Sequence, residues 1–367
     1  MPDMRRRDFM LGATTGAIVA GLPAIVHGKA TTLGELAAAK GLLFGCPLRL
    51  PLLDSEPGYA AMAQECSLYV CGDMQWRLVA PSPTVTNLAK PDAARRWAFA
   101  HGMKLKGHAL LWHLQTPAWF TTLQDRAAAL RALQGHIQTM CGHFAGSMQS
   151  WDVVNEPLQI GDRPDGLRAT PFLKQIGPEY LDYAFQAARE ADGKPLLVLN
   201  ENSLEYDVPE QRGKRRAMLN LIDGFKRRNT PIDAVGIQSH LSTAERNNFN
   251  EAVFARFLGE ISARGLKIMV TEMDMIDTGS PSDIKARDAD VADFYRQYLD
   301  VALANRATIA VVTWGLTDKE SWIRHGAFPQ FIRKDALPVR PLPFDDRYRR
   351  KPAYDAIARA LAAAPQR

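Results

Sequence analysis

Short apolar runs alternate with amphipathic stretches along most of this chain, and this alternation limits its possible folds more than any other feature. Eight runs lack the polar alternation of half-exposed strands and are predicted as parallel strands covered on both faces. They span residues 42–48, 67–72, 104–112, 149–155, 196–200, 234–240, 267–273 and 309–314. Helical spacing of apolar residues predicts helices over residues 91–101, 124–144, 179–191, 209–228, 251–264, 284–304 and 351–363.

Successive βα units of this kind predict an α/β fold, a single-domain (β/α)8 TIM barrel over residues 31–367. The chain has 367 residues, within the range of such barrels with extended loops. An open doubly wound sheet is the alternative. It would carry a phosphate-binding turn after its first strand, and Gly45-Cys46-Pro47 is not such a turn.

The first thirty residues have the character of a targeting signal. Arginines 5–7 precede an apolar stretch over residues 9–26 that contains several Gly and Thr residues and one Pro. This arrangement resembles a twin-arginine export signal, which predicts a periplasmic or secreted protein without stable membrane association after signal removal. An uncleaved membrane anchor is the alternative.

The net charge of +5 gives little reason to expect a nucleic-acid partner, because three of the positive residues lie in the signal. Basic clusters at residues 214–216 and 226–228 fall in one predicted helix. We expect them to form a solvated outer helix face, since no nucleic-acid-binding module or interleaved aromatic residues accompany them.

The four cysteines are irregularly spaced, without a CxxC pair, so neither a zinc site nor a disulfide framework is indicated. Buried free thiols are the expectation for most of Cys46, Cys66, Cys71 and Cys141. No ligand cluster has metal spacing, and neither a metal nor an organic cofactor is expected.

The active site of a TIM barrel lies at the C-terminal ends of its strands. Polar and aromatic residues gather at these predicted ends: His108, Trp112, His113, Asn155, Glu156, Asn200, Glu201, Gln238, His240, Glu272, Asp274, Trp314 and Asp318. Barrel strands are normally apolar, so this concentration predicts a catalytic or binding site at one rim.

Two glutamates stand out within these strand ends. Glu156 and Glu272 each follow a run of apolar residues, where a carboxylate costs desolvation energy unless it has a use. Cleavage of a glycosidic bond needs one carboxyl group as proton donor and another as nucleophile or base. A separation of about 5–5.5 Å between the two carboxyl groups gives retention of the anomeric configuration, and a separation of about 6.5–9.5 Å gives inversion.

Tryptophans strengthen the case for carbohydrate. Trp112, Trp314 and Trp322 are predicted near the same rim, where their flat faces can stack on sugar rings. A single tryptophan is more often part of the core, but three near one rim favour a polysaccharide ligand.

The motifs around these residues resemble those of glycoside hydrolase family 10, the β-1,4-xylanase family. The similar segments are residues 107–117 (Gly-His-Ala-Leu-Leu-Trp-His-Leu-Gln-Thr-Pro), 151–157 (Trp-Asp-Val-Val-Asn-Glu-Pro), 236–240 (Gly-Ile-Gln-Ser-His), 271–274 (Thr-Glu-Met-Asp) and 314–322. Residues 343–346 and 351–354 resemble the closing segment of the family. The likeness extends from about Gly41 to the C-terminus in the family's order.

The resemblance implies a role for each matching residue. Glu156 is expected to be the acid/base and Glu272 the nucleophile of a retaining endo-β-glycanase. Asp274 should orient the carboxylate of Glu272 or tune its charge without contacting substrate. Substrate contacts are implied for His108, Trp112, Gln115, Asn155, Gln238, His240, Trp314 and Trp322, with His240 also orienting the nucleophile. For His113, a structural role and a substrate contact are equally expected.

Two segments depart from the family pattern. The family usually has Glu-Asn-x-Met-Lys-Trp at the end of strand two, where three polar groups hold the second sugar on the non-reducing side. Residues 71–76 read Cys-Gly-Asp-Met-Gln-Trp, so Cys71, Gly72 and Gln75 replace those groups. After strand five, residues 200–203 read Asn-Glu-Asn-Ser in place of Asn-Asp-Tyr-Asn. The hypothesis is that the chemistry is kept while the preferred glycan has shifted.

The sequence therefore predicts a monomeric hydrolase of β-1,4-linked polysaccharide, with xylan as the favoured substrate. The alternatives are a glycanase of the same fold acting on another β-glycan, such as an exported bacterial polysaccharide, and a non-catalytic glycan-binding protein. A basic protein that binds anionic polymers is a further alternative, and it would show salt-sensitive affinity.

Overall fold

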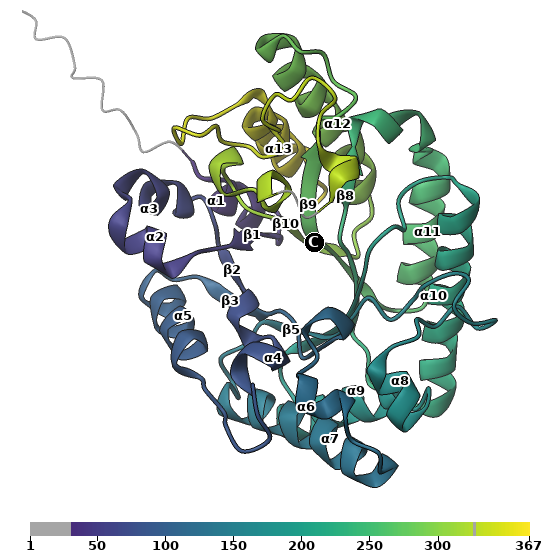
Figure 1. The fold of residues 1–367 in the computed structure, drawn as a ribbon. Coiled ribbons are helices and arrows are strands. Elements are labelled where there is room, and N and C mark those ends of the chain that lie inside the picture. Colours follow the sequence, from purple (N-terminus) through teal and green to yellow (C-terminus); the bar gives the residue numbers. More distant parts are fainter. Residues whose placement is uncertain (1–30, 326–327) are drawn as a thin grey trace, which may run out of the picture. The chain divides into compact units, whose positions relative to one another are not determined.

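The strands of this protein close into a ring. The computed structural model describes residues 31–325 and 328–367. Neighbouring strands are parallel in the order β10, β1, β2, β3, β5, β6, β7 and β9, and β9 pairs in turn with β10. Figure 1 looks into the ring formed by residues 32–367, with the helices outside it. The predicted TIM barrel is confirmed.

The strands agree with the predicted runs, with two interruptions. Their bounds are β1 Leu43–Pro47, β2 Leu68–Cys71, β3 Lys104–Gly107, β4 Leu111–Trp112, β5 Ser150–Asn155, β6 Leu196–Glu201, β7 Ala234–Ile237, β8 His240–Ser242, β9 Lys267–Ile276 and β10 Thr308–Thr313. The predicted strands 104–112 and 234–240 were wrong as continuous elements. Residues 108–110 separate β3 from β4, and Ser239, whose φ of 66° is left-handed, helps to separate β7 from β8.

The helices form an outer layer. Their bounds are α1 Leu33–Ala38, α2 Leu50–Ser55, α3 Pro57–Ala63, α4 Trp76–Val79, α5 Ala89–Ala100, α6 Ala118–Thr121, α7 Arg126–His143, α8 Pro171–Ile176, α9 Tyr180–Ala191, α10 Pro209–Arg228, α11 Glu251–Ala263, α12 Ile284–Ala304 and α13 Pro352–Ala363. Short 3₁₀ turns are η1 Gly72–Met74, η2 His113–Gln115, η3 Thr243–Asn248, η4 Asp318–Glu320, η5 Trp322–His325 and η6 Pro329–Phe331.

Local sequence explains where the longer helices begin and end. Asp125 accepts hydrogen bonds from the free N–H groups at the start of α7, and Asp283 does the same for α12. Pro209 stands at the first position of α10, and Asn229 ends that helix in the left-handed conformation. These signals explain why the predicted bounds of α10 and α12 agree with the structure.

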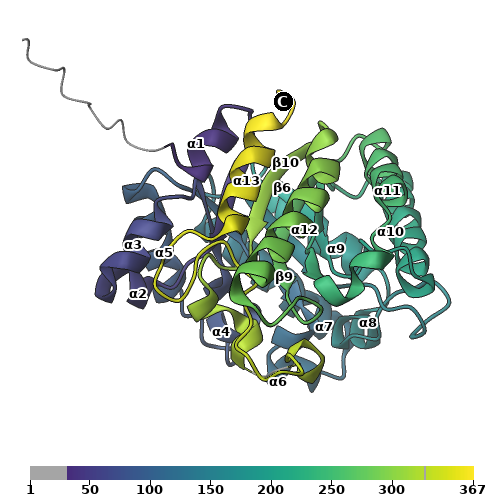
Figure 2. The ribbon, with the colours of Figure 1, turned by 90° about the horizontal axis from the view of Figure 1, so that it is seen from above.

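The core has two layers separated by the sheet. Leu197 and Leu199 of β6 belong to the large apolar cluster shared with the helices. Val198 lies between them and points to the other face, where it packs with Met269 and Ala310. This inner cluster fills the barrel, so the structure is a packed core with its site at one end. In Figure 2, α4 and α6, which follow the C-terminal ends of β2 and β4, lie at the opposite end from the chain terminus.

The basic residues of α10 only partly form a solvated face. Exposed fractions are 3% for Lys214 and 5% for Arg215, so the prediction was wrong for these two. Lys214 forms an ion pair with the buried Glu201 at 2.8 Å. Arg215 donates to the carbonyls of Leu204 and Tyr206 at 2.9 and 2.7 Å. Both side chains therefore bind the chain at and just after the C-terminal end of β6.

The four cysteines are buried free thiols. The Sγ atoms of Cys46 and Cys66 lie 3.5 Å apart. No helix in the described part of the chain is long and apolar enough to cross a membrane. The predicted export signal, residues 1–30, lies outside the described residues.

Candidate active site

A cavity of about 450 Å³ lies at the C-terminal ends of the barrel strands. Glu156 and Glu272 both line it. It also brings together most of the residues predicted for the site, namely His108, Trp112, Asn155, Gln238, His240, Trp314 and Trp322. The strand-end rule therefore selected side chains that share one cavity.

Glu156 directly follows β5 and is held by two donors. Gln238 Nε2 donates to its Oε1 at 3.0 Å, and Trp112 Nε1 donates to its Oε2 at 3.1 Å. Burial acts to raise the pKa of Glu156, but these hydrogen bonds and the charges of His113 and Arg168 together lower it below its usual value. The free site therefore stabilises the ionised form of this carboxyl group.

Glu272 lies in β9, and only 4% of its surface is exposed. Asn200 Nδ2 donates to its Oε1 at 2.7 Å. His240 Nε2 lies 3.3 Å from its Oε2. Both oxygens thus have polar partners that fix the direction of the carboxylate within the cavity.

His240 connects this carboxylate to a second one behind it. Its Nδ1 lies 3.0 Å from Asp274 Oδ1, and Trp322 Nε1 donates to Asp274 Oδ2 at 2.7 Å. Burial opposes protonation of His240, but Asp274 and Glu272 raise its pKa well above the usual value. A protonated His240 can donate to both carboxylates, so it joins Asp274 to Glu272.

Three amide side chains bridge the two glutamates. Asn200 Nδ2 donates to Asn155 Oδ1 at 2.8 Å as well as to Glu272. Gln238 Nε2 donates to Asn155 Oδ1 at 3.2 Å as well as to Glu156. A fixed network of this kind sets the relative positions of the two carboxylates before substrate arrives.

A buried ionic group lies beneath the cavity. Asp152 of β5 is within 2.5 Å of Lys106 Nζ and 2.9 Å of His108 Nδ1, and all three side chains are at most 2% exposed. His108 Nδ1 also lies 3.9 Å from Glu272 Oε1. Burial disfavours the charged form of His108, but the charges of Glu272 and Asp152 raise its pKa above the usual value.

Gln115 is placed differently from the other predicted contacts. Its Oε1 accepts a hydrogen bond from Arg77 Nε at 2.9 Å, and it does not belong to the lining of the cavity. His113 does line the cavity, and its Nδ1 is buried with no partner among the described residues. Burial and the charge of Arg168 lower the pKa of His113 to about 4, so it is neutral near pH 7.

Of the two segments expected to depart from the family pattern, residues 71–76 begin at the last residue of β2, and residues 200–203 lie at the end of β6. Cys71 is buried, and burial raises the pKa of its thiol to about 12. A Cβ atom added to Gly72 would meet no other atom within 4 Å. Open space therefore lies beside Gly72, at the position where the resemblance implies a polar side chain in the family.

Several residues that build the site were not predicted from the sequence. Asn200 was noted at a strand end but given no role, and it proves to join Asn155 to Glu272. Arg168 lines the cavity from a loop that no motif marked. Asp152 stood inside the quoted motif of residues 151–157, and the available signal was a carboxylate within a strand predicted to be covered on both faces.

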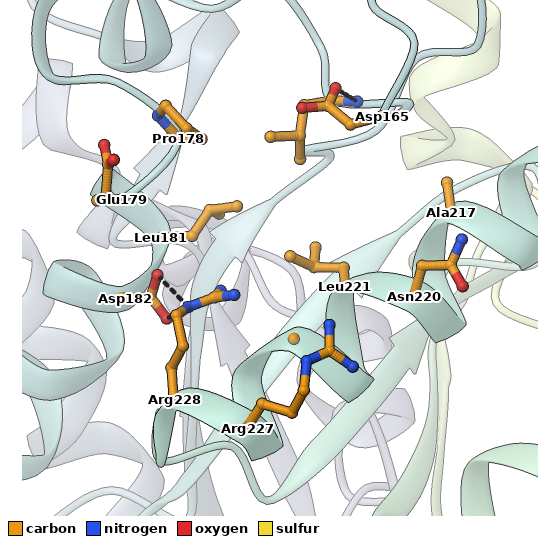
Figure 3. Close-up of a pocket in the computed structure, with 12 residues that line it drawn as sticks. Asp165, Pro178, Glu179, Leu181, Asp182, Ala217, Asn220, Leu221, Arg227 and Arg228 are labelled. Carbon is orange, nitrogen blue, oxygen red and sulfur yellow. Dashed lines mark hydrogen bonds and ion pairs between the residues drawn. The ribbon is translucent and has the colours of Figure 1, made fainter.

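Among residues 31–325 and 328–367, no three or more His, Cys, Asp or Glu side chains are grouped so as to hold a metal ion. A second hollow of about 340 Å³ lies on the outer side of the barrel, where α9 and α10 meet (Figure 3). Leu181, Ala217 and Leu221 contribute apolar atoms to it, and Asp182 and Arg228 pair at its edge. It shares no lining residue with the cavity that holds the two glutamates.

A TIM barrel with two glutamates bridged by polar side chains, and with tryptophans at its C-terminal rim, has the site of a glycoside hydrolase. Comparison with protein families specifies the class further. The chain matches the model of glycosyl hydrolase family 10 over residues 32–360. It belongs to this family, and the resemblance drawn from its motifs is confirmed.

Individual relatives are similar over most of the chain. Endo-1,4-beta-xylanase B of Thermotoga neapolitana is 31% identical over 310 residues, which cover 83% of this chain and 84% of the relative. Exoglucanase XynX of Acetivibrio thermocellus is 34% identical over 299 residues, covering 77% of this chain and 25% of the relative. The crystal structure of xylanase 10B from Thermotoga petrophila RKU-1 in complex with xylobiose superposes with a TM-score of 0.80 at 28% identity, covering 91% and 98% of the two chains.

Proposed function

We propose that this protein hydrolyses β-1,4-linked xylan by double displacement with retention, with Glu272 as nucleophile and Glu156 as acid/base. The observation that carries the proposal is the pair of glutamates in one cavity, bridged by the amides of Asn155, Asn200 and Gln238. The similarity to xylanases supports the choice of xylan.

The surroundings of each glutamate suit its proposed role. In the first step Glu272 attacks the anomeric carbon while Glu156 gives a proton to the leaving oxygen. Asn200 and His240 hold Glu272 in position for this attack. Glu156 is then ionised, and the hydrogen bonds from Gln238 and Trp112 stabilise the base that activates water in the second step.

A different β-glycan is the second candidate, and the open space at Gly72 favours it. A buried thiol at Cys71 offers a weak donor where the family pattern has a carboxylate. A glycan that needs no polar contact there would lose little binding free energy, because an absent pair of partners costs less than one unpaired group.

The purified protein is expected to release xylo-oligosaccharides from xylan, detected by mass spectrometry, with mixed-linkage glucan, cellulose, mannan and bacterial exopolysaccharides assayed in parallel. Proton NMR of the first minutes of the reaction should show the β-anomer of the new reducing end, followed by mutarotation, because double displacement retains configuration.

Each other outcome changes the proposal in a defined way. The α-anomer appearing first would contradict retention. Products from another glycan alone would assign the substrate to that glycan and support a role for Cys71 and Gly72 in the shift. Binding without any product would support a non-catalytic glycan-binding protein.

We propose in addition that the N-terminal segment exports the protein, so that it meets its glycan outside the cytoplasm. The support is the arginine pair Arg6-Arg7 ahead of a weakly apolar stretch. Replacing Arg6 and Arg7 together by lysine is expected to leave the protein in the cytoplasmic fraction, measured by immunoblot after cell fractionation. Arg5→Lys is the matched control and should leave export intact. Unchanged export of the double variant would exclude the twin-arginine route.

A further inference from the structure

The backbone of Glu156 has an uncommon conformation. Its φ is 55°, in the left-handed region that side chains other than glycine rarely adopt. The residue also stands immediately before Pro157, which has no N–H to donate. Such a conformation persists only where neighbouring groups fix it. The contacts of residues 156–158 show which groups do so.

Arg168 binds both carbonyl groups that flank Pro157. Its Nε donates to Glu156 O at 2.9 Å, and its Nη2 donates to Leu158 O at 3.2 Å. The backbone N–H of Arg168 donates to Pro157 O at 2.7 Å. One residue thus fixes three successive carbonyl groups around the acid/base, and the planar fork of the guanidinium suits the two outer ones.

Arg168 is itself held in place by a hairpin. Leu158 and Leu167 form an antiparallel bridge, and Gln159 N donates to Gly166 O at 2.9 Å. Gly166 has φ of 80°, and a Cβ atom there would lie 2.7 Å from the Cβ of Ala217 in α10. Figure 3 shows the outer side of this hairpin at Asp165, facing α10 at Ala217.

A buried ion pair secures the segment from the other side. Glu201 Oε2 accepts from Leu158 N at 2.9 Å, and Glu201 Oε1 pairs with Lys214 Nζ at 2.8 Å. Glu156 N in turn donates to Asn200 O at 2.9 Å. Arg168 forms no ion pair within the part of the chain that the structure describes, so its side chain has no carboxylate partner to explain it.

We propose that Arg168 is a positioning residue for acid catalysis, which holds Glu156 in its left-handed conformation so that the carboxyl group faces the scissile oxygen. The inference rests on the proposed function of Glu156 as acid/base. It assigns to Arg168 a contribution to proton donation and not to the attack by Glu272.

The test compares Arg168→Met with the wild type on aryl β-xylobiosides whose leaving groups differ in pKa. Proton donation matters most for poor leaving groups. For phenyl xylobioside kcat is expected to fall about 100-fold, the loss typical of a displaced catalytic group, with KM little changed. For 2,4-dinitrophenyl xylobioside, whose leaving group needs no proton, the fall in kcat/KM, which reports the first step alone, should stay below about threefold.

Arg168→Lys separates charge from geometry. Lysine keeps the positive charge but not the planar fork, so kcat for phenyl xylobioside should remain low. Burial acts to raise the pKa of Glu156, whereas its two hydrogen bonds and the charge of Arg168 lower it. The fall of kcat/KM with rising pH should therefore move to higher pH in Arg168→Met and stay near its wild-type position in Arg168→Lys.

Other titratable or charged groups border the same carboxyl group and stay unchanged in these variants. They are His113, Asp162, Glu201, Lys214, His240 and Glu272. Arg163→Met is the matched control, because Arg163 lies in the same hairpin, pairs with Asp165 and does not line the cavity. It should leave kcat and the pH profile unchanged.

Equal losses on all leaving groups in Arg168→Met, or full recovery in Arg168→Lys, would overturn the proposal. If the wild type cleaves none of these xylosides, the proposed xylan hydrolysis fails, and the role of Arg168 is then tested by the conformation of Glu156 in the variant. A crystal structure of Arg168→Met should then show Glu156 outside the left-handed region. An unchanged φ and an unchanged carboxyl position would overturn the inference independently of activity.

Discussion

Replacing Glu272 with glutamine is expected to lower kcat on xylan by roughly 10⁶-fold, the size of loss found when a hydrolase loses its covalent nucleophile. Glutamine has the shape of glutamate, and its carbonyl can still accept the hydrogen bond from Asn200 Nδ2. It cannot form the glycosyl ester on which double displacement depends. The loss should therefore appear in kcat while the affinity for xylo-oligosaccharides changes little.

The measurement is initial-rate kinetics on xylan, with binding of xylo-oligosaccharides measured by calorimetry. Circular dichroism should show an unchanged fold. Glu260→Gln provides a matched control, because Glu260 is an exposed glutamate on α11, outside the cavity. A Glu272→Gln variant with more than about a tenth of wild-type activity would exclude Glu272 as the nucleophile, since covalent catalysis tolerates no such substitution.

The sequence allowed prediction of the barrel and of the rim for physical reasons that are easy to trace. Strands covered on both faces read as apolar runs, and a carboxylate at the end of such a run, as at Glu156 and Glu272, is conspicuous. The rule that strand ends of a barrel meet at one face then places residues far apart in the chain in one cavity. His240 and Asp274 entered the prediction by the same route, with their roles taken from the family resemblance.

Breaks within strands and pairings between particular side chains could not be predicted from the periodicity of the sequence. The breaks after β3 and β7 depend on local backbone conformations, such as the left-handed Ser239, that apolar periodicity does not reveal. Lys214 was expected in solvent because a basic helix face is normally exposed, but its partner Glu201 comes from β6. Nothing in the spacing of the two residues indicates this pairing, since the fold alone brings them together.

Asp152 is expected to have the largest effect on stability among the residues beneath the site. It is fully buried between Lys106 and His108. Asp152→Asn keeps the shape of the side chain and leaves the ammonium group of Lys106 without its counter-charge. Removing one partner of a buried ion pair typically costs about 3–5 kcal/mol of unfolding free energy. Urea unfolding at pH 7 measures this loss, and the control is an unchanged m-value.

The pH dependence of stability should change in the same variant. The pKa of His108 is raised in the folded state by Glu272 and Asp152 against the effect of burial. The stability that comes from a raised histidine pKa is fully present below the unfolded value of about 6.5 and is lost as pH rises through the folded value. Asp152→Asn removes one of the two charges, so its unfolding free energy should decline less between pH 6 and pH 8 than that of the wild type.

A second substitution tests whether the loss of unfolding free energy in Asp152→Asn arises from the uncompensated charge of Lys106. Adding Lys106→Met to Asp152→Asn removes the buried ammonium group as well, and apolar replacement of a buried ion pair is often close to neutral. The double variant should therefore recover most of the unfolding free energy that the single variant loses. Because His108 keeps an amide partner in both variants, a double variant as unstable as Asp152→Asn would instead assign the loss to the contact between Asp152 and His108. In that case Asp152 would stabilise the barrel by holding a histidine of the active site rather than by neutralising Lys106.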